Sequence, residues 1–125
     1  MKFLVFIVTD RSVAHIEEPP GAIQAWVKEG AERGIRLDGD RLRPPEGAKL
    51  VRIRDGKKLV TDGPFAETKE WIAGYDLLEC RDLDEAVDYV LRHPMAARGQ
   101  IEIRPLWPFD ETASLMSTQS RPSQH

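Results

Sequence analysis

The pattern of apolar and polar positions divides this chain into short strands and two helices. Residues 3–8 are apolar on both alternating faces, so a strand over residues 2–9 should be covered on both sides. Residues 71–80 have the same character and predict another strand of this kind. Residues 101–106 alternate apolar with polar side chains, which predicts a last strand with one wetter face.

Two segments have the spacing of helices. The first helix is predicted between Gly21 and Gly34, where apolar residues recur at helical intervals. The second should begin after Asp82, because Glu85 three residues later completes a capping-box pattern, and it should end before Pro94. Its inward-facing residues are predicted to be Leu83, Ala86, Val87, Val90 and Leu91.

A hairpin and a connection fill the middle of the chain. Asp55-Gly56 favours positive backbone φ and is a strong signal for a tight turn between residues 50–54 and 58–62. We therefore expect two antiparallel hairpin strands. Residues 35–48 are rich in turn-forming residues and are interpreted mainly as a connection that holds a short strand near Leu42.

The order of these elements predicts an α+β fold, a ferredoxin-like antiparallel sheet with two helices on one face. Two helices cover only one face of such a sheet, so a second copy of the chain is the simplest cover for the other. We expect a homodimer joined through its sheet faces. Residues 1–107 should form the domain, and residues 108–125, rich in Ser, Thr and Gln, a flexible C-terminal tail.

The composition fits one folded domain without a strongly charged partner. The 125 residues are 41% apolar and 31% charged, and 18 Lys and Arg against 21 Asp and Glu give a net charge of -3. This balance offers no general attraction for nucleic acid or anionic membranes, and no stretch is long enough to span a bilayer. The apolar run at residues 3–8 is too short for a secretory signal, and Cys80 is the single cysteine, so we expect a cytoplasmic protein without disulfides.

Residues 61–70 carry the densest chemistry in the chain. Gly63 can adopt backbone angles that are closed to other residues, and Pro64 fixes its own φ. The carboxylate of Asp62 can accept hydrogen bonds from nearby backbone N–H groups. These properties predict a rigid turn with a seated carboxylate.

The side chains after this turn leave two interpretations open. Phe65 should anchor the turn in the core, while Glu67 and Lys69 point the same way if the backbone is extended. In one interpretation the turn is purely structural and the two charges form a solvated ion pair that contributes little. In the other, these side chains line a pocket.

The segment at residues 62–70, Asp-Gly-Pro-Phe-Ala-Glu-Thr-Lys-Glu, closely resembles the signature of the DGPF group within the YCII-related family. Segments at residues 51–57, 82–86 and 99–105 support the resemblance, which covers roughly residues 1–107. It implies a dimeric α+β barrel built from ferredoxin-like subunits, in agreement with the strand pattern. It also implies small bacterial proteins, some with relatives joined to sigma-factor-like transcription regulators, and most without an assigned reaction.

One feature of the wider family is missing here. In that family a His on the first helix and an Asp are regarded as an acid–base pair in a cleft beside the sheet. The corresponding residues 22–25 of this chain are Ala-Ile-Gln-Ala, and His15 falls before the predicted helix. The pair is therefore not carried over, and catalysis would need other groups.

The remaining candidates are predicted to have structural roles. A positive imidazole at His93 would interact favourably with the dipole at the end of the second helix. Cys80 ends an apolar strand and is interpreted as a small buried hydrophobic residue. No metal-ligand spacing, phosphate loop or dinucleotide motif occurs in the sequence, so we expect no metal and no cofactor.

Two functions of different classes follow. The first is a module that binds a small molecule in a pocket next to the turn, in a regulatory setting with a transcription regulator as partner. Its candidate ligand-binding residues are Gly63, Pro64, Phe65, Trp71 and Tyr75. The alternative is a cofactor-free lyase or isomerase in which Asp62 or Glu67 moves a proton and Lys69 steadies developing negative charge.

Overall fold

The structure is a computed structural model that describes residues 1–10, 19–63 and 70–110. Its strands are β1 (Lys2–Asp10), β2 (Arg36–Arg41), β3 (Lys49–Arg54), β4 (Lys57–Asp62), β5 (Glu70–Glu79) and β6 (Gln100–Pro105). Its helices are α1 (Ala22–Glu32) and α2 (Leu83–Leu91), with short 3-10 helices η2 (Pro45–Gly47) and η3 (Pro94–Ala97). In this part of the chain, no helix is long and apolar enough to cross a membrane.

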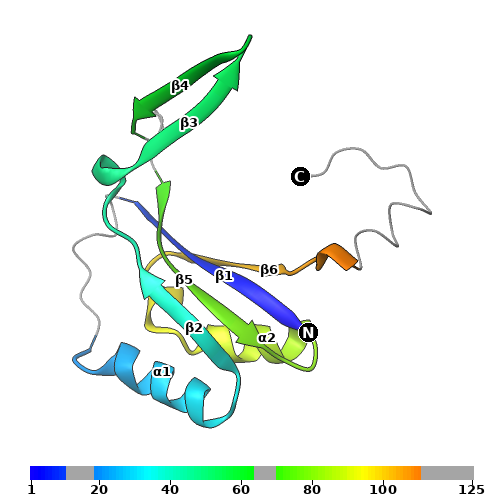
Figure 1. The fold of residues 1–125 in the computed structure, drawn as a ribbon. Helices are drawn as coiled ribbons and strands as arrows, with labels where there is room; N and C mark the ends of the chain where they lie inside the picture. Colours follow the sequence, from blue (N-terminus) through cyan, green and yellow to red (C-terminus); the bar gives the residue numbers. More distant parts are fainter. Residues whose placement is uncertain (11–18, 64–69, 111–125) are drawn as a thin grey trace.

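Four strands form the main sheet, in the order β2, β5, β1, β6, and all neighbours are antiparallel. The strands follow one another as β1, α1, β2 and then β5, α2, β6, with β1 and β5 in the centre, which is a ferredoxin-like arrangement. Figure 1 shows both helices on the same side of this sheet. The predicted α+β, ferredoxin-like fold is therefore confirmed.

The two faces of the sheet differ in what covers them. On β1, the alternate residues Phe3, Val5 and Ile7 face the helices and are buried. The face without helices carries half-buried apolar side chains: Leu4, Phe6 and Val8 on β1 with Tyr75 and Leu77 on β5. The prediction that both faces of these strands are covered is confirmed on the helix side, and within the described residues the second face stays partly exposed.

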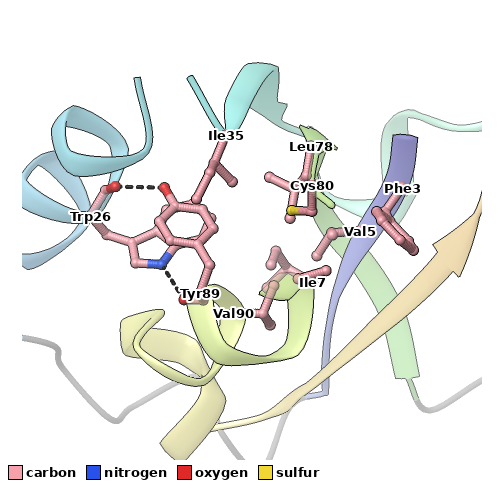
Figure 2. Close-up of a cluster of buried hydrophobic side chains, with 10 residues drawn as sticks. Phe3, Val5, Ile7, Trp26, Ile35, Leu78, Cys80, Tyr89 and Val90 are labelled. Atoms are coloured by element: carbon pink, nitrogen blue, oxygen red, sulfur yellow. Dashed lines mark hydrogen bonds between the residues drawn. The ribbon is translucent and has the colours of Figure 1, made fainter. Parts of the chain in front are cut away.

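The core lies between the helices and the sheet. Figure 2 shows Trp26 from α1 against Tyr89 from α2, with Ile35, Leu78 and Cys80 beside them. Burial raises the pKa of the Cys80 thiol, which fits the predicted small hydrophobic residue and not a reactive thiolate.

Helix α2 begins as predicted but presents a different face. Asp82 caps it by accepting a hydrogen bond from the Glu85 backbone N–H at 2.9 Å. The Glu85 carboxylate in turn accepts from the backbone N–H of Arg81 at 2.8 Å. Ala86 and Val90 are buried as expected, together with Tyr89.

Part of the predicted inward face of α2 is wrong. Leu83, Val87 and Leu91 are exposed. The reason is the hydroxyl of Tyr89, which donates to the backbone carbonyl of Trp26 at 2.6 Å and turns this side of α2 toward α1. The spacing of apolar residues does not reveal this, because the position of a buried tyrosine depends on the hydrogen bond of its hydroxyl as well as on the packing of its ring.

The interpretation of residues 35–48 mainly as a connection is also wrong. Strand β2 occupies Arg36–Arg41 and pairs with β5 at the edge of the main sheet. Its sequence, Arg-Leu-Asp-Gly-Asp-Arg, has almost no apolar content. Edge strands need only one hydrogen-bonded neighbour and often carry charged side chains, so this strand lacks the hydrophobic pattern that marks the central ones.

The hairpin forms where the sequence predicts it but not as part of the main sheet. Asp55 and Gly56 have φ of 52° and 75°, the positive values expected of its tight turn. β3 and β4 pair only with each other among the described residues, and Figure 1 shows them projecting away from the sheet and helices. Val51, Ile53 and Val60 on one face of this hairpin are exposed.

Candidate functional site

A cavity of about 620 Å³ lies on the helix side of the sheet, between α1, strands β2 and β5, and the start of η3. This volume falls inside the range of small-molecule pockets, roughly 300–1,000 Å³. Its apolar wall includes Ile7, Ile23, Trp26, Val27, Ala73 and Met95. The polar part of the lining is small and is built around three side chains that come from three different elements.

The first two polar side chains form a buried ion pair. The Nε of Arg36 on β2 donates to Oδ1 of Asp76 on β5 at 2.7 Å. Asp76 is only 5% exposed, and an isolated carboxylate at such a position would carry a large desolvation penalty. The pairing of the polar edge strand β2 with the apolar strand β5 is what brings the guanidinium to this carboxylate.

Gly39 makes room for this pair. A side chain on Gly39 would lie well inside van der Waals distance of the terminal Nη2 of Arg36, and a Cβ there would be 2.5 Å from Oδ1 of Asp76. The backbone of Gly39 does not have positive φ. The glycine is therefore needed for the close approach of the ion pair to the backbone and not for an unusual conformation.

The third polar side chain is His93, which caps η3 at the end of the α2 segment. The backbone N–H of Met95 donates to its Nδ1 at 2.9 Å, and the Trp26 ring meets it edge-on with centroids 4.5 Å apart. His93 is 6% exposed, and this burial lowers its pKa; the nearby Asp76 opposes the shift, and Arg36 adds to it. The predicted positive imidazole at a helix end is therefore wrong, because a neutral ring is favoured.

Asp76 and His93 both line the cavity, and each has one polar atom that is not used in the contacts above. Within the described residues, no hydrogen bond is made to Oδ2 of Asp76 or by Nε2 of His93. Neither atom is sealed completely from solvent, although both residues are more than nine-tenths buried and line the cavity. The site therefore presents an acceptor at Asp76 and a ring nitrogen at His93 to anything that enters.

The lining carries no net charge. Arg36 and Asp76 balance each other inside, and Asp40 and Arg41 do so at the exposed rim. Among the described residues, no three or more His, Cys, Asp or Glu side chains are arranged as metal ligands would be. The absence of a metal or cofactor remains a prediction from the sequence.

The residues predicted from the turn at 61–70 are only partly described. Pro64, Phe65, Glu67 and Lys69 lie outside the described residues. Gly63 has φ of 125°, so it does use backbone angles closed to other residues. These residues stay candidates on the sequence alone.

Asp62 ends β4 and is in a different setting from the one predicted. Its carboxylate forms an ion pair with Nζ of Lys49 across the hairpin, and its side chain is 85% exposed. It is a solvated hairpin carboxylate in the described structure, and it does not line the 620 Å³ cavity. An exposed pair of this kind contributes little to stability.

The two aromatic candidates point to separate places. Trp71 lines a smaller hollow of about 350 Å³ against residues 42–48, close to the turn, where the backbone N–H of Gly63 donates to the carbonyl of Ala48 at 2.9 Å. Tyr75 borders the 620 Å³ cavity, but its side chain is on the face of β5 without helices, beside Phe6 of β1. The predicted ligand-binding residues therefore do not share one hollow.

The polar centre of the large cavity was not singled out by sequence reasoning. Asp76 is a carboxylate in the apolar middle of β5, and a buried charge of that kind requires a partner. That signal was available in the sequence. Arg36 was not identified because its strand has no hydrophobic pattern. For His93, the local sequence does not indicate that the residue caps η3 or that it lines a cavity.

Comparison with known proteins supports the resemblance to the YCII-related family. The YCII-related domain family matches residues 1–110. An uncharacterised protein of Rhizobium meliloti (strain 1021) is 44% identical over 68 residues, which are 53% of this chain and 55% of that protein. The chain thus spans about half the length of this curated relative. The match over residues 1–110, together with the ferredoxin-like fold, shows that this chain belongs to the YCII-related family.

Proposed function

We propose that this chain binds a small molecule in the cavity between α1, the sheet and η3. One observation carries the proposal. Two side chains that are more than nine-tenths buried, Asp76 and His93, line this cavity, and each has a polar atom without a hydrogen bond in the described structure. A few polar groups that converge on an apolar wall are what orient a small molecule in a pocket, and these two atoms can supply them.

The cavity supports this function better than the hollow beside the turn. The smaller hollow takes its described lining from Leu42, Trp71, Ile72 and the Pro-rich connection, with Arg43 as its only charged member. It offers no buried ionisable group. Convergent polar groups on an apolar wall are what fix the orientation of a small ligand. The turn residues 62–70 remain a secondary candidate that the sequence favours.

The test is a thermal-shift screen of a small-metabolite library against three forms of the full chain. The wild type should be stabilised by a class of related compounds, because a ligand that binds only the folded state raises Tm. The Arg36→Met/Asp76→Leu double variant should lose that response, and Asp62→Asn should keep it. Loss of the response in Asp62→Asn alone would place the site at the turn and reject the proposal.

A second candidate function is acid–base catalysis without a cofactor, of the lyase or isomerase type. Oδ2 of Asp76 is an acceptor within the cavity, where a carboxylate can take a proton from a bound substrate. Asp62, Glu67 and Lys69 remain the alternative groups for this chemistry. For any compound that binds, turnover that falls in Asp76→Asn but not in a Glu67→Gln/Lys69→Met variant would assign the reaction to the cavity.

We also propose that the chain is a homodimer joined through the open sheet faces, as a dimeric α+β barrel. The half-buried side chains of β1 and β5 on that face form a contiguous apolar surface, which marks interaction sites in proteins of this size. The cytoplasmic setting and the association with a transcription regulator rest on the sequence and the family resemblance. Ligand occupancy of the cavity would then be the signal that such a regulator reads.

A further inference from the structure

The hydrogen bonding of His93 fixes which atom can act in the cavity. Nδ1 accepts from the backbone N–H of Met95, so this nitrogen carries no proton in the neutral ring. The single ring proton is then on Nε2. His93 therefore meets a ligand as a neutral N–H donor, and its basic lone pair, on Nδ1, is taken by the Met95 N–H.

The ion pair supplies the complementary groups. Oδ1 of Asp76 is taken by Arg36, which leaves Oδ2 as an acceptor for a ligand N–H or O–H. The terminal N–H groups of the guanidinium are further donors on the lining. The cavity thus offers donors from His93 and Arg36 and an acceptor from Asp76.

The charge balance of this group decides what kind of molecule fits. A carboxylate ligand would add a second negative charge near Asp76, where the imidazole is neutral and the Arg36 guanidinium is already paired; the other cation of the lining, Arg41, is at the exposed rim beside Asp40. An ammonium or amidinium ligand would add a second positive charge near Arg36, and the Asp76 carboxylate is already paired with that guanidinium. A molecule of no net charge avoids both penalties and still satisfies the open polar atoms.

We infer that the cavity takes an uncharged molecule with an apolar or aromatic body that carries a carbonyl-type acceptor and an N–H donor, the chemistry of carboxamides and lactams. This inference rests on the proposed function of the cavity. The carbonyl oxygen accepts from Nε2–H of His93 or from Arg36, and the N–H donates to Oδ2 of Asp76. The apolar body packs against Trp26 and Val27.

Four probes of similar size and different polarity test this assignment. Benzamide carries the acceptor and donor, benzoate is its anionic analogue, benzamidine the cationic one, and ethylbenzene lacks polar groups. Benzamide, benzoate and benzamidine are titrated into the isotope-labelled full chain to roughly 20 mM, and ethylbenzene to its lower solubility limit in water, because ligands this small bind with Kd near the millimolar range. Chemical shifts of the Gly74 and Met95 amides and of His93 Nε2 report on the cavity.

Benzamide is expected to bind about tenfold tighter than the three other probes, a difference of about 1.4 kcal/mol, and to shift the His93 Nε2 resonance. The Arg36→Met/Asp76→Leu double variant should lose this preference and bind benzamide and ethylbenzene alike, while Asp62→Asn keeps it. A dispersed spectrum of the double variant verifies that it is folded.

The opposite results separate the two proposals. If benzoate, benzamidine or ethylbenzene shifts the cavity resonances at lower concentration than benzamide, the ligand class is wrong and the cavity is still a binding site. If no probe shifts them, both the ligand class and the proposed function of the cavity are overturned.

Discussion

Trp26 on α1 and Tyr89 on α2 each donate a hydrogen bond to the backbone carbonyl of the other. The indole Nε1 reaches the Tyr89 carbonyl at 2.9 Å, and the phenol reaches the Trp26 carbonyl at 2.6 Å. Their rings stack with centroids 4.1 Å apart, as Figure 2 shows. This reciprocal contact joins the two helices over the sheet and also holds the wall of the cavity, because Trp26 lines it.

The Trp26–Tyr89 contact predicts an unusual response at Gly30. Replacing a glycine in a helix interior by alanine ordinarily stabilises the helix by about 1 kcal/mol. A Cβ at position 30 would instead overlap the ring and hydroxyl of Tyr89, so Gly30→Ala should destabilise the fold by about 1–3 kcal/mol in urea unfolding. The loss should shrink in a Tyr89→Phe background. A raised Tm in Gly30→Ala alone would contradict this packing.

Gly39→Ala tests the close approach of the ion pair to the backbone. The added methyl would overlap Arg36 and Asp76 and approach the Tyr75 carbonyl, so we expect a loss of about 1–3 kcal/mol in unfolding free energy and weaker ligand binding. Gly47→Ala is the matched control, because nothing lies within 4 Å of a Cβ there and its φ is not positive. Equal stability of the two variants would show that the pair does not occupy this space.

The buried ion pair should show strong coupling between its two members. Asp76→Leu alone or Arg36→Met alone leaves one uncompensated charge and should lower the unfolding free energy by about 3–5 kcal/mol. The double variant should be much closer to wild type, because replacing both members by apolar residues removes the desolvation penalty. Additive losses in a double-mutant cycle would mean that the two side chains do not interact.

His93 makes the stability of the fold depend on pH in a known direction. Its folded-state pKa is lowered below the ordinary value of 6.5, so the unfolded chain binds the proton more readily. The contribution is fully present above pH 6.5 and is lost as the pH falls through that value toward the lower folded-state pKa.

His93→Asn tests this dependence, because asparagine can keep the cap on η3 without titrating. Denaturant unfolding between pH 8 and pH 5 should show a smaller loss of stability in this variant than in wild type. His125→Gln, at the C-terminus, is the control and should behave like wild type. Identical pH profiles for all three proteins would contradict the neutral, buried imidazole.

The proposed homodimer predicts that one charge on the open face separates the subunits. Light scattering should give wild type twice the chain mass of 14.2 kDa and Leu77→Lys a monomer. Leu91→Lys is a matched control on the exposed side of α2 and should stay dimeric. A wild-type protein that is monomeric at micromolar concentration would reject the sheet-to-sheet assembly.

The sequence predicted the central strands and both helices because their side chains are buried and therefore patterned. Residues 3–8 are apolar on both faces, residues 71–80 are mostly so apart from Asp76 and Glu79, and Asp82 marks the start of α2 by its hydrogen bond. Strand β2 escaped prediction because its stability comes from backbone pairing at a sheet edge and not from its own side chains.

The candidate site was less accessible to sequence reasoning, because its polar atoms meet only through tertiary structure. Arg36 and Asp76 are 40 positions apart and are joined by the pairing of β2 with β5. Residues 61–70 were chosen as candidates because their chemical groups are adjacent in the sequence. Asp62, the described residue of this segment that was proposed for catalysis, lies exposed on the hairpin.

The most direct test of the proposed site is a crystal structure of the protein with the compound that gives the largest thermal shift in the metabolite screen. The proposed function predicts electron density for that compound between α1, β5 and η3, with polar atoms within hydrogen-bond distance of Asp76 and His93. Electron density for the compound against Trp71 and residues 42–48, with the large cavity unoccupied, would contradict the proposed function and indicate that the binding site is next to the turn at residues 61–70.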